Sequence, residues 1–184
     1  MASVFDPIKM KAGDTDRSNN WYRGQVNRIA SGTTAQQLFR QGKLAKRPSV
    51  GRLNLFGYNP KLRKTLPYYD IFPLVLPLEA ISGGFIGMNF HYLPPLLRMR
   101  LLERMQARAT DKDFDKDTKF DVTYDDVKRI GIVKPTIKKY LYSYVQTGFL
   151  RINADEAATA IFLPVQRFKK APDSVVYRDS RRFI

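Results

Sequence analysis

The side chains able to do acid–base, nucleophilic or metal chemistry are few in this sequence and lie far apart. The 184 residues include one histidine and no cysteine, which excludes a two-histidine metal site, a thiolate nucleophile and a disulfide. No acid or nucleophile is placed near His91 by the sequence, so we expect it to form structural hydrogen bonds. Asp70 and Glu79 fall in predicted strands, but a metal-dependent nuclease needs two or three carboxylates and a lysine converging on Mg²⁺. The inventory predicts a protein that is not an enzyme and binds no cofactor and no metal.

Phosphate-binding and calcium-binding motifs are also missing. The chain has no GxxxxGK[ST] or GxGxxG loop and no GxSxG elbow. Four aspartates alternate as in a calcium loop, namely Asp111, Asp113, Asp115 and Asp117. The glycine and glutamate required at the sixth and twelfth positions of that loop are replaced by Lys116 and Val122. We interpret this stretch as a solvated, charged loop.

Basic side chains are the abundant chemistry of this chain. Lys and Arg total 32 against 17 Asp and Glu, a net charge of +15, and residues 1–65 hold 13 basic and 3 acidic side chains. Such a concentration neutralises phosphates, or else lies over an acidic protein neighbour. We predict duplex DNA binding without base preference. The candidate nucleic-acid-binding residues are Lys43, Lys46, Arg47, Arg52, Lys61, Arg63, Lys64, Lys134, Lys138, Lys139, Arg178, Arg181 and Arg182.

The first of these residues belong to a polar N-terminal segment. Residues 1–49 are rich in Gly, Asn, Ser, Thr and Gln, and only Thr34–Gln41 has a helical pattern. Trp21 and Tyr22 either anchor this segment in a groove or form a short helix that closes the domain's core. We expect a basic, largely extended arm over residues 1–49 and a single domain over residues 50–184.

The domain begins with a strand pattern. Strands are predicted at Arg52–Tyr58, Tyr68–Glu79 and Phe85–Leu93, the last two forming a hairpin. Pro73 and Pro77 are four residues apart, so in a strand their backbone nitrogens lie on the same side. Proline has no amide donor, and we therefore expect that side of the strand to be an unpaired edge. Two further prolines then open a helix at 96–108, in which apolar residues face the sheet and Arg98 belongs to the polar surface.

The C-terminal part of the domain is expected to contain two helices and two strands. A short helix begins near Thr123, and Pro135 opens a second helix over Thr136–Thr147. This helix-turn-helix would present Lys134, Lys138 and Lys139 outward. Strands at 149–152 and 160–165 flank a spacer at 156–159. The order of elements predicts an α+β fold, with a small twisted antiparallel sheet or partial barrel and packed helices. No apolar run approaches the ~20 residues of a membrane span, and no membrane partner is expected.

Several whole segments resemble a known family. These segments are LFGYNPKLRKTLPYYDIFPLVLPLE (Leu55–Glu79), GFIGMNFHYLPPLLRMRLLERM (Gly84–Met105), VKPTIKKYLYSYV (Val133–Val145), AIFLPVQRF and VYRDSRR. In them the sequence resembles the DNA end protectors of T-even-like tailed bacteriophages and cyanophages.

The resemblance implies a minor virion protein that binds the ends of the packaged genome and shields injected DNA from host exonucleases. Its expected partners are duplex DNA at the genome ends and other virion proteins at the portal, neck or tail. Its expected location is the virion, and the host cytoplasm during assembly and infection. The alternative is a structural neck or tail-baseplate component whose basic arm and exposed strand edge bind other virion proteins.

Overall fold

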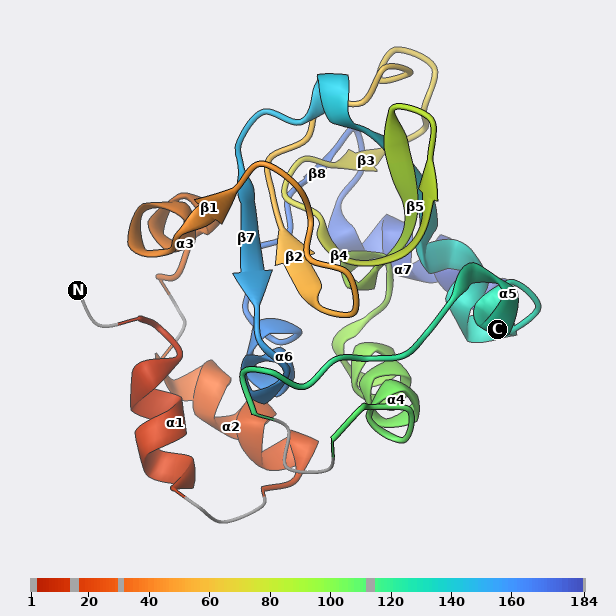
Figure 1. Cartoon of the computed structure of the whole chain (residues 1–184). Helices are drawn as coiled ribbons and strands as arrows, with labels where there is room; N and C mark the ends of the chain where they lie inside the picture. The colour runs from red at the N-terminus through yellow and green to blue at the C-terminus, as the bar shows by residue number, and fades with distance from the viewer. Residues whose placement is uncertain (1–2, 14–16, 30–31, 112–114, 184) are drawn as a thin grey trace.

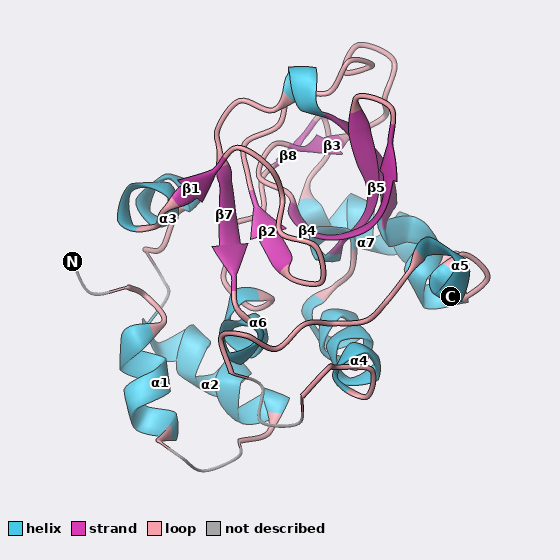
Figure 2. Cartoon of the chain, in the orientation of Figure 1, coloured by secondary structure: helices cyan, strands magenta, loops and turns pink. Residues whose placement is uncertain are grey.

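A curved antiparallel sheet organises the computed structural model, which describes residues 3–13, 17–29, 32–111 and 115–183 (Figure 1). The helices pack mainly at one end of the sheet, and the architecture is α+β as predicted, without a closed barrel (Figure 2). In spatial order the strands are β1 (Leu44–Ala45), β7 (Phe149–Ile152), β2 (Leu53–Leu55), β4 (Leu74–Ile81), β5 (Gly84–Asn89) and β6 (Ile137–Leu141). A separate pair joins β3 (Tyr69–Asp70) to β8 (Phe168–Lys169).

The described residues also form seven α-helices and three short 3₁₀ helices. The α-helices are α1 (Asp6–Ala12), α2 (Asn19–Ile29), α3 (Ala35–Gln41), α4 (Pro95–Gln106), α5 (Tyr124–Val127), α6 (Ala154–Ala160) and α7 (Asp173–Arg181). The 3₁₀ helices are η1 (Phe90–Tyr92), η2 (Gly131–Thr136) and η3 (Tyr142–Tyr144). Within the described part of the chain, no helix has the length and apolar character needed to cross a membrane.

The predicted extended conformation of residues 1–49 is wrong for α1 and α2, which pack on the domain together with the predicted helix α3. Their apolar residues Ile8, Val26 and Leu38 are buried in the same core cluster as the sheet. The Lys9 ammonium also pairs with Asp155 at 2.9 Å and Glu156 at 3.0 Å, which fixes α1 against α6. Although this segment is mostly polar, its few widely spaced apolar side chains are sufficient to pack these helices against the core. The boundary at residues 49 and 50 remains a prediction.

The predicted helix at Thr34–Gln41 is confirmed as α3. The Thr34 side chain accepts a hydrogen bond from the Gln37 amide, and the Gln37 side chain accepts one from the Thr34 amide. Trp21 lies in α2 and packs partly buried against the main core, which is the second of the two expectations for that residue.

The predicted β4–β5 hairpin is also confirmed, with Gly83 at φ 71° in its turn. The predicted unpaired edge is wrong for Leu74 and Val75, which pair with β2, whereas residues 76–81 have ladder partners only in β5 among the described residues. Pro73 precedes β4, and Pro77 lies at a register irregularity between Pro77 and Glu79. Bulges and strand starts are positions where a missing amide donor is tolerated inside a sheet. The two prolines therefore interrupt the ladder without ending the sheet.

The predicted second helix of the helix-turn-helix is wrong. Residues 137–141 form the edge strand β6, paired with β5 from Met88↔Ile137 to Gly84↔Leu141. A Cβ at Gly84 would lie 1.9 Å from the Tyr140 carbonyl oxygen, so glycine permits this close pairing. The predicted spacer at 156–159 and strand at 160–165 are also wrong, because residues 154–160 form the helix α6 and residues 161–164 form turns and bends.

The two faces of the sheet bury different clusters. The larger core lies under the helices, whereas Phe56, Phe85, Tyr140 and Phe149 form an aromatic cluster on the other face. The Phe85 and Phe149 ring centroids are 6.1 Å apart although three strand steps separate β5 from β7. Contact across that many strands requires strong curvature, which places the outer surface of β6 against the segments that follow β2.

Candidate nucleic-acid interface

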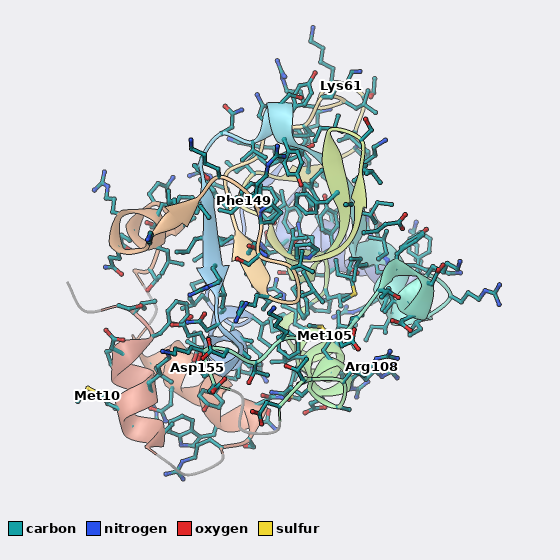
Figure 3. All side chains as sticks on the ribbon, in the orientation of Figure 1. Met10, Lys61, Met105, Arg108, Phe149 and Asp155 are labelled. Atoms are coloured by element: carbon teal, nitrogen blue, oxygen red, sulfur yellow. The ribbon has the colours of Figure 1, made fainter. Side chains whose placement is uncertain are left out.

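A groove of about 630 Å³ lies beside β6, at the end of the molecule where Figure 3 places Lys61. It collects residues from the segment after β2, the loop at 60–67, β3, η1, β6 and the C-terminal segment. Its lining comprises Tyr58, Pro60, Lys61, Leu62, Leu66, Pro67, Tyr68, Tyr69, Asp70, Tyr92, Lys138, Lys139, Tyr140, Leu141 and Phe183. Five tyrosines and three lysines thus meet in one depression.

Lys138 holds the most unusual charge of the groove. Its Nζ lies 4.0 Å from the centroid of the Tyr92 ring, within the range of a cation–π contact. Among the described residues no carboxylate pairs with it, and burial lowers the pKa of Lys138 to about 8. An anion entering the groove would meet a positive charge that no protein carboxylate neutralises.

The loop that carries Lys61, Arg63 and Lys64 has a defined conformation. The Arg63 amide donates to the Pro60 carbonyl at 3.2 Å, and the Leu66 amide donates to the Leu62 carbonyl at 3.0 Å. The Lys170 ammonium donates to the carbonyls of Lys64 (2.9 Å) and Leu66 (2.7 Å), which ties the loop to the segment after β8. The three basic side chains of the loop remain exposed.

The end of α7 adjoins the groove, because Phe183, which follows Arg182, is part of its lining. Burial and Asp179 raise the pKa of the Tyr68 hydroxyl, while the charges of Arg178 and Arg182 act in the opposite direction. Tyr68 itself lines the groove, so these two arginines lie close to it in space. The Ser180 hydroxyl donates to the Tyr92 carbonyl at 2.6 Å and fixes α7 against η1.

The remaining predicted residues lie outside this groove. Lys43, Lys46 and Arg47 flank β1, and the Arg47 guanidinium stacks 4.1 Å from the Tyr142 ring centroid. Lys134 is exposed on η2 rather than on a helix-turn-helix, and Arg181 is exposed at the end of α7. The structure thus unites the loop and β6 lysines with α7 arginines, and separates them from the basic residues around β1.

Arg52 lies apart from the exposed basic side chains. It is 9% exposed, and its Nη2 donates to the carbonyls of Lys116 (3.0 Å) and Asp117 (3.2 Å). These bonds hold the charged loop against the start of β2. In this arrangement Arg52 stabilises the fold, and its guanidinium does not face the groove.

A buried polar network forms the floor beneath the tyrosines. With its imidazole neutral, His91 donates from Nδ1 to the Asp70 Oδ2 at 2.8 Å, and the Asn89 amide donates to the same oxygen at 3.2 Å. Burial lowers the pKa of His91 even though Asp70 favours its charged form. The expected structural role of His91 agrees with these bonds. Asp70 is buried, and its carboxylate accepts the hydrogen bonds that hold His91 and Asn89 beneath the groove.

Arg98 anchors the same floor, contrary to its predicted place on the polar surface of the helix. It is 1% exposed and donates to the carbonyls of Leu93 (2.7 Å), Ile161 (3.0 Å) and His91 (3.3 Å) and to the Tyr177 hydroxyl (2.7 Å). These bonds join α4, η1, α7 and the segment after α6. Arg98 lies three, four and seven residues before the buried Leu101, Leu102 and Met105, so helical spacing places it on the apolar face, unlike the exposed Arg100; sequence reasoning missed this signal.

The groove tyrosines were missed as well, although the sequence carries a signal for them. Tyrosines flank the basic residues at positions 58–69 and again at 138–144. Aromatic residues interleaved with basic ones are typical of surfaces that bind nucleic acid by stacking and by phosphate contacts.

A groove lined by tyrosines and lysines, with arginines of α7 nearby, is typical of nucleic-acid-binding proteins. The family comparison narrows this class: residues 8–178 match the family model described as Phage T4 terminal DNA protecting protein. The chain belongs to this family of bacteriophage virion proteins that bind DNA and protect its ends. No curated protein and no solved structure matches the chain.

Proposed function

We propose that this protein binds the ends of duplex DNA without base preference and blocks exonuclease access to them. The observation that carries the proposal is the groove beside β6, where Lys61, Lys138 and Lys139 face a common space. Backbone phosphates supply the charge complementary to these lysines, and such contacts carry no sequence information. Arg178 and Arg182 extend the positive surface toward α7.

End protection is tested with linear duplex DNA, a processive exonuclease and increasing protein. We expect intact DNA at saturating protein, and closed circular DNA should compete poorly because it offers no terminus. Competition by circular DNA as effective as that by linear DNA would show that only phosphates are recognised, since the electrostatic attraction does not distinguish ends. Incubation of the same DNA with Mg²⁺ and no exonuclease is the control for the proposed lack of catalysis.

The location and partners of the protein form a second part of this proposal. Family membership supports a place near the genome ends. We extend the proposal to a location in the virion and a contact with portal, neck or tail proteins. Because β2 pairs with β4 only at Leu74 and Val75, a structural role based on an exposed edge of this strand is limited to residues 76–81.

DNA affinity should fall as the pH rises from 7 to 9. Lys138 attracts phosphate only when protonated, and its pKa of about 8 means that the free protein loses this charge within that interval. Bound phosphate would favour the protonated form, so affinity should drop by up to about tenfold between pH 7 and 9. Fluorescence anisotropy of labelled DNA at constant ionic strength measures the change.

The matched control for this pH effect is Lys138→Arg, which stays charged and can still stack on Tyr92. Its affinity should be flat from pH 7 to 9. Burial raises the pKa of the surrounding hydroxyls of Tyr58, Tyr68, Tyr92 and Tyr140, which keeps them neutral there. The other charged groups facing the space are Lys61, Lys139 and Asp70. An equal pH dependence in both proteins would contradict the assignment to Lys138.

A further inference from the structure

We propose that the groove beside β6 binds an unpaired nucleotide at the DNA terminus, with its base against Tyr68 and Leu62 and its phosphates facing the lysines. This inference rests on the proposed function, which it deepens by naming the part of the DNA end that is recognised. The occupant is a nucleotide released from base pairing, rather than the side of an intact duplex.

The size of the groove favours this occupant. About 630 Å³ lies within the range of roughly 300–1,000 Å³ typical of pockets that enclose small ligands. An intact duplex exposes phosphates and base edges along its sides, while the faces of its bases are covered by stacking. A concave site of this volume therefore fits one or two nucleotides that have left the stack.

Phosphate contacts alone do not explain why part of the groove lining is apolar. Leu62 is 60% exposed and Phe183 is 57% exposed, and both line the groove. Tyr68 is half-buried beside them, with its ring centroid 6.1 Å from that of Tyr92. Aromatic side chains bind any base through its flat face, which suits a protein that must accept every terminal sequence.

The charge of the groove selects an anion. Its lining has three lysines and one carboxylate, Asp70, which is 3% exposed. That carboxylate already accepts hydrogen bonds from His91, Asn89 and the amides of Phe72 and Arg167. The lysines are therefore available to a ligand that joins a flat apolar group to negative charge, which is the chemistry of a nucleotide.

DNA ends with a single-stranded overhang should bind more tightly than blunt ends. A blunt end must first unpair its terminal bases, which costs free energy that an overhang does not need. We expect at least one overhang polarity, 3′ or 5′, to bind roughly tenfold more tightly than a blunt duplex of equal charge. A 2-aminopurine at the terminal position should be quenched on binding.

Two variants test the assignment to this groove. Leu62→Ser and Tyr68→Leu should each reduce the overhang preference to near one, because overhang affinity falls further than blunt-duplex affinity. The matched control is Leu96→Ser, since Leu96 is also an exposed leucine (50%) but lies in α4, outside the groove lining. Circular dichroism of each variant verifies that the fold is retained.

The outcomes separate this inference from the function on which it rests. Protection of blunt ends without any overhang preference would overturn the inference and leave the proposed function intact. A preference that survives both groove variants would also overturn it. Displacement of the overhang by polyglutamate at equal charge concentration would indicate a site that recognises charge alone, against the inference. Failure to protect any linear DNA would overturn both.

Discussion

Replacing Arg98 with methionine should lower the free energy of unfolding by about 3–5 kcal/mol, because the variant leaves buried carbonyl oxygens without donors. The carbonyls of Leu93, His91 and Ile161 lose the guanidinium, as does the Tyr177 hydroxyl. Such a loss is a large part of the ~5–15 kcal/mol that stabilises a typical domain. Urea unfolding followed by circular dichroism measures it.

Arg100→Met is the matched control for this prediction. It is the same substitution two residues further along α4, at an exposed position, and its effect should stay within about 0.5 kcal/mol of the wild type. Arg98→Lys should fall between the two, because an ammonium keeps the charge but lacks the planar set of donors. A wild-type unfolding midpoint for Arg98→Met would contradict the role assigned to the network.

Neutralising three basic residues around the groove should weaken DNA binding by about 100-fold at physiological salt. The variant is Lys61→Gln, Lys139→Gln and Arg182→Gln, one residue from each of the three segments that meet there. If each residue contacts one phosphate, the slope of log affinity against log salt should also become shallower by roughly 2.7. Gel-shift titrations across a range of salt concentrations give both quantities.

The control variant removes the same charge from the helical end of the molecule. Lys11→Gln, Arg28→Gln and Arg100→Gln change exposed residues of α1, α2 and α4, which Figure 1 shows away from the loop at 60–67. Its affinity should change severalfold at most, and its salt slope should stay the same. Equal losses in the two triple variants would mean that net charge, rather than the groove, determines binding.

Sequence reasoning predicted the fold class, the hairpin and the helices α3, α4 and α5 because each depends on local signals, but it missed α6 with its capping box at Asn153 and Glu156. Gly83 in a tight turn, prolines ahead of α4 and the reciprocal hydrogen bonds at Thr34 act within a few residues. Strand β6, which was predicted as a helix, shows that local signals do not always determine the secondary structure. Residues 133–145 carry apolar spacings that suit a helix, yet Ile137, Tyr140 and Leu141 also suit a strand, and pairing with β5 decides in favour of the strand.

The sequence identified the basic residues of the candidate site but not their arrangement in space. The basic clusters at 61–64, 138–139 and 178–182 were identified as separate segments, and only the curvature of the sheet brings them around one groove. Arg52 and Arg98 are basic residues that were predicted to be exposed but are buried. A long basic side chain is expected in solvent, and whether carbonyls elsewhere in the chain require its donors depends on tertiary contacts that no local pattern encodes.

The pairing of β2 with β7 has a consequence for how the protein is made. Leu53–Leu55 lies against residues 150–152, so almost a hundred residues must leave the ribosome before this contact forms. The β4–β5 hairpin joins near neighbours and can assemble early, whereas contacts so distant in sequence slow folding. The groove lining extends from Tyr58 to Phe183. A nascent chain therefore carries its basic N-terminal third long before it has the surface proposed to bind a DNA end.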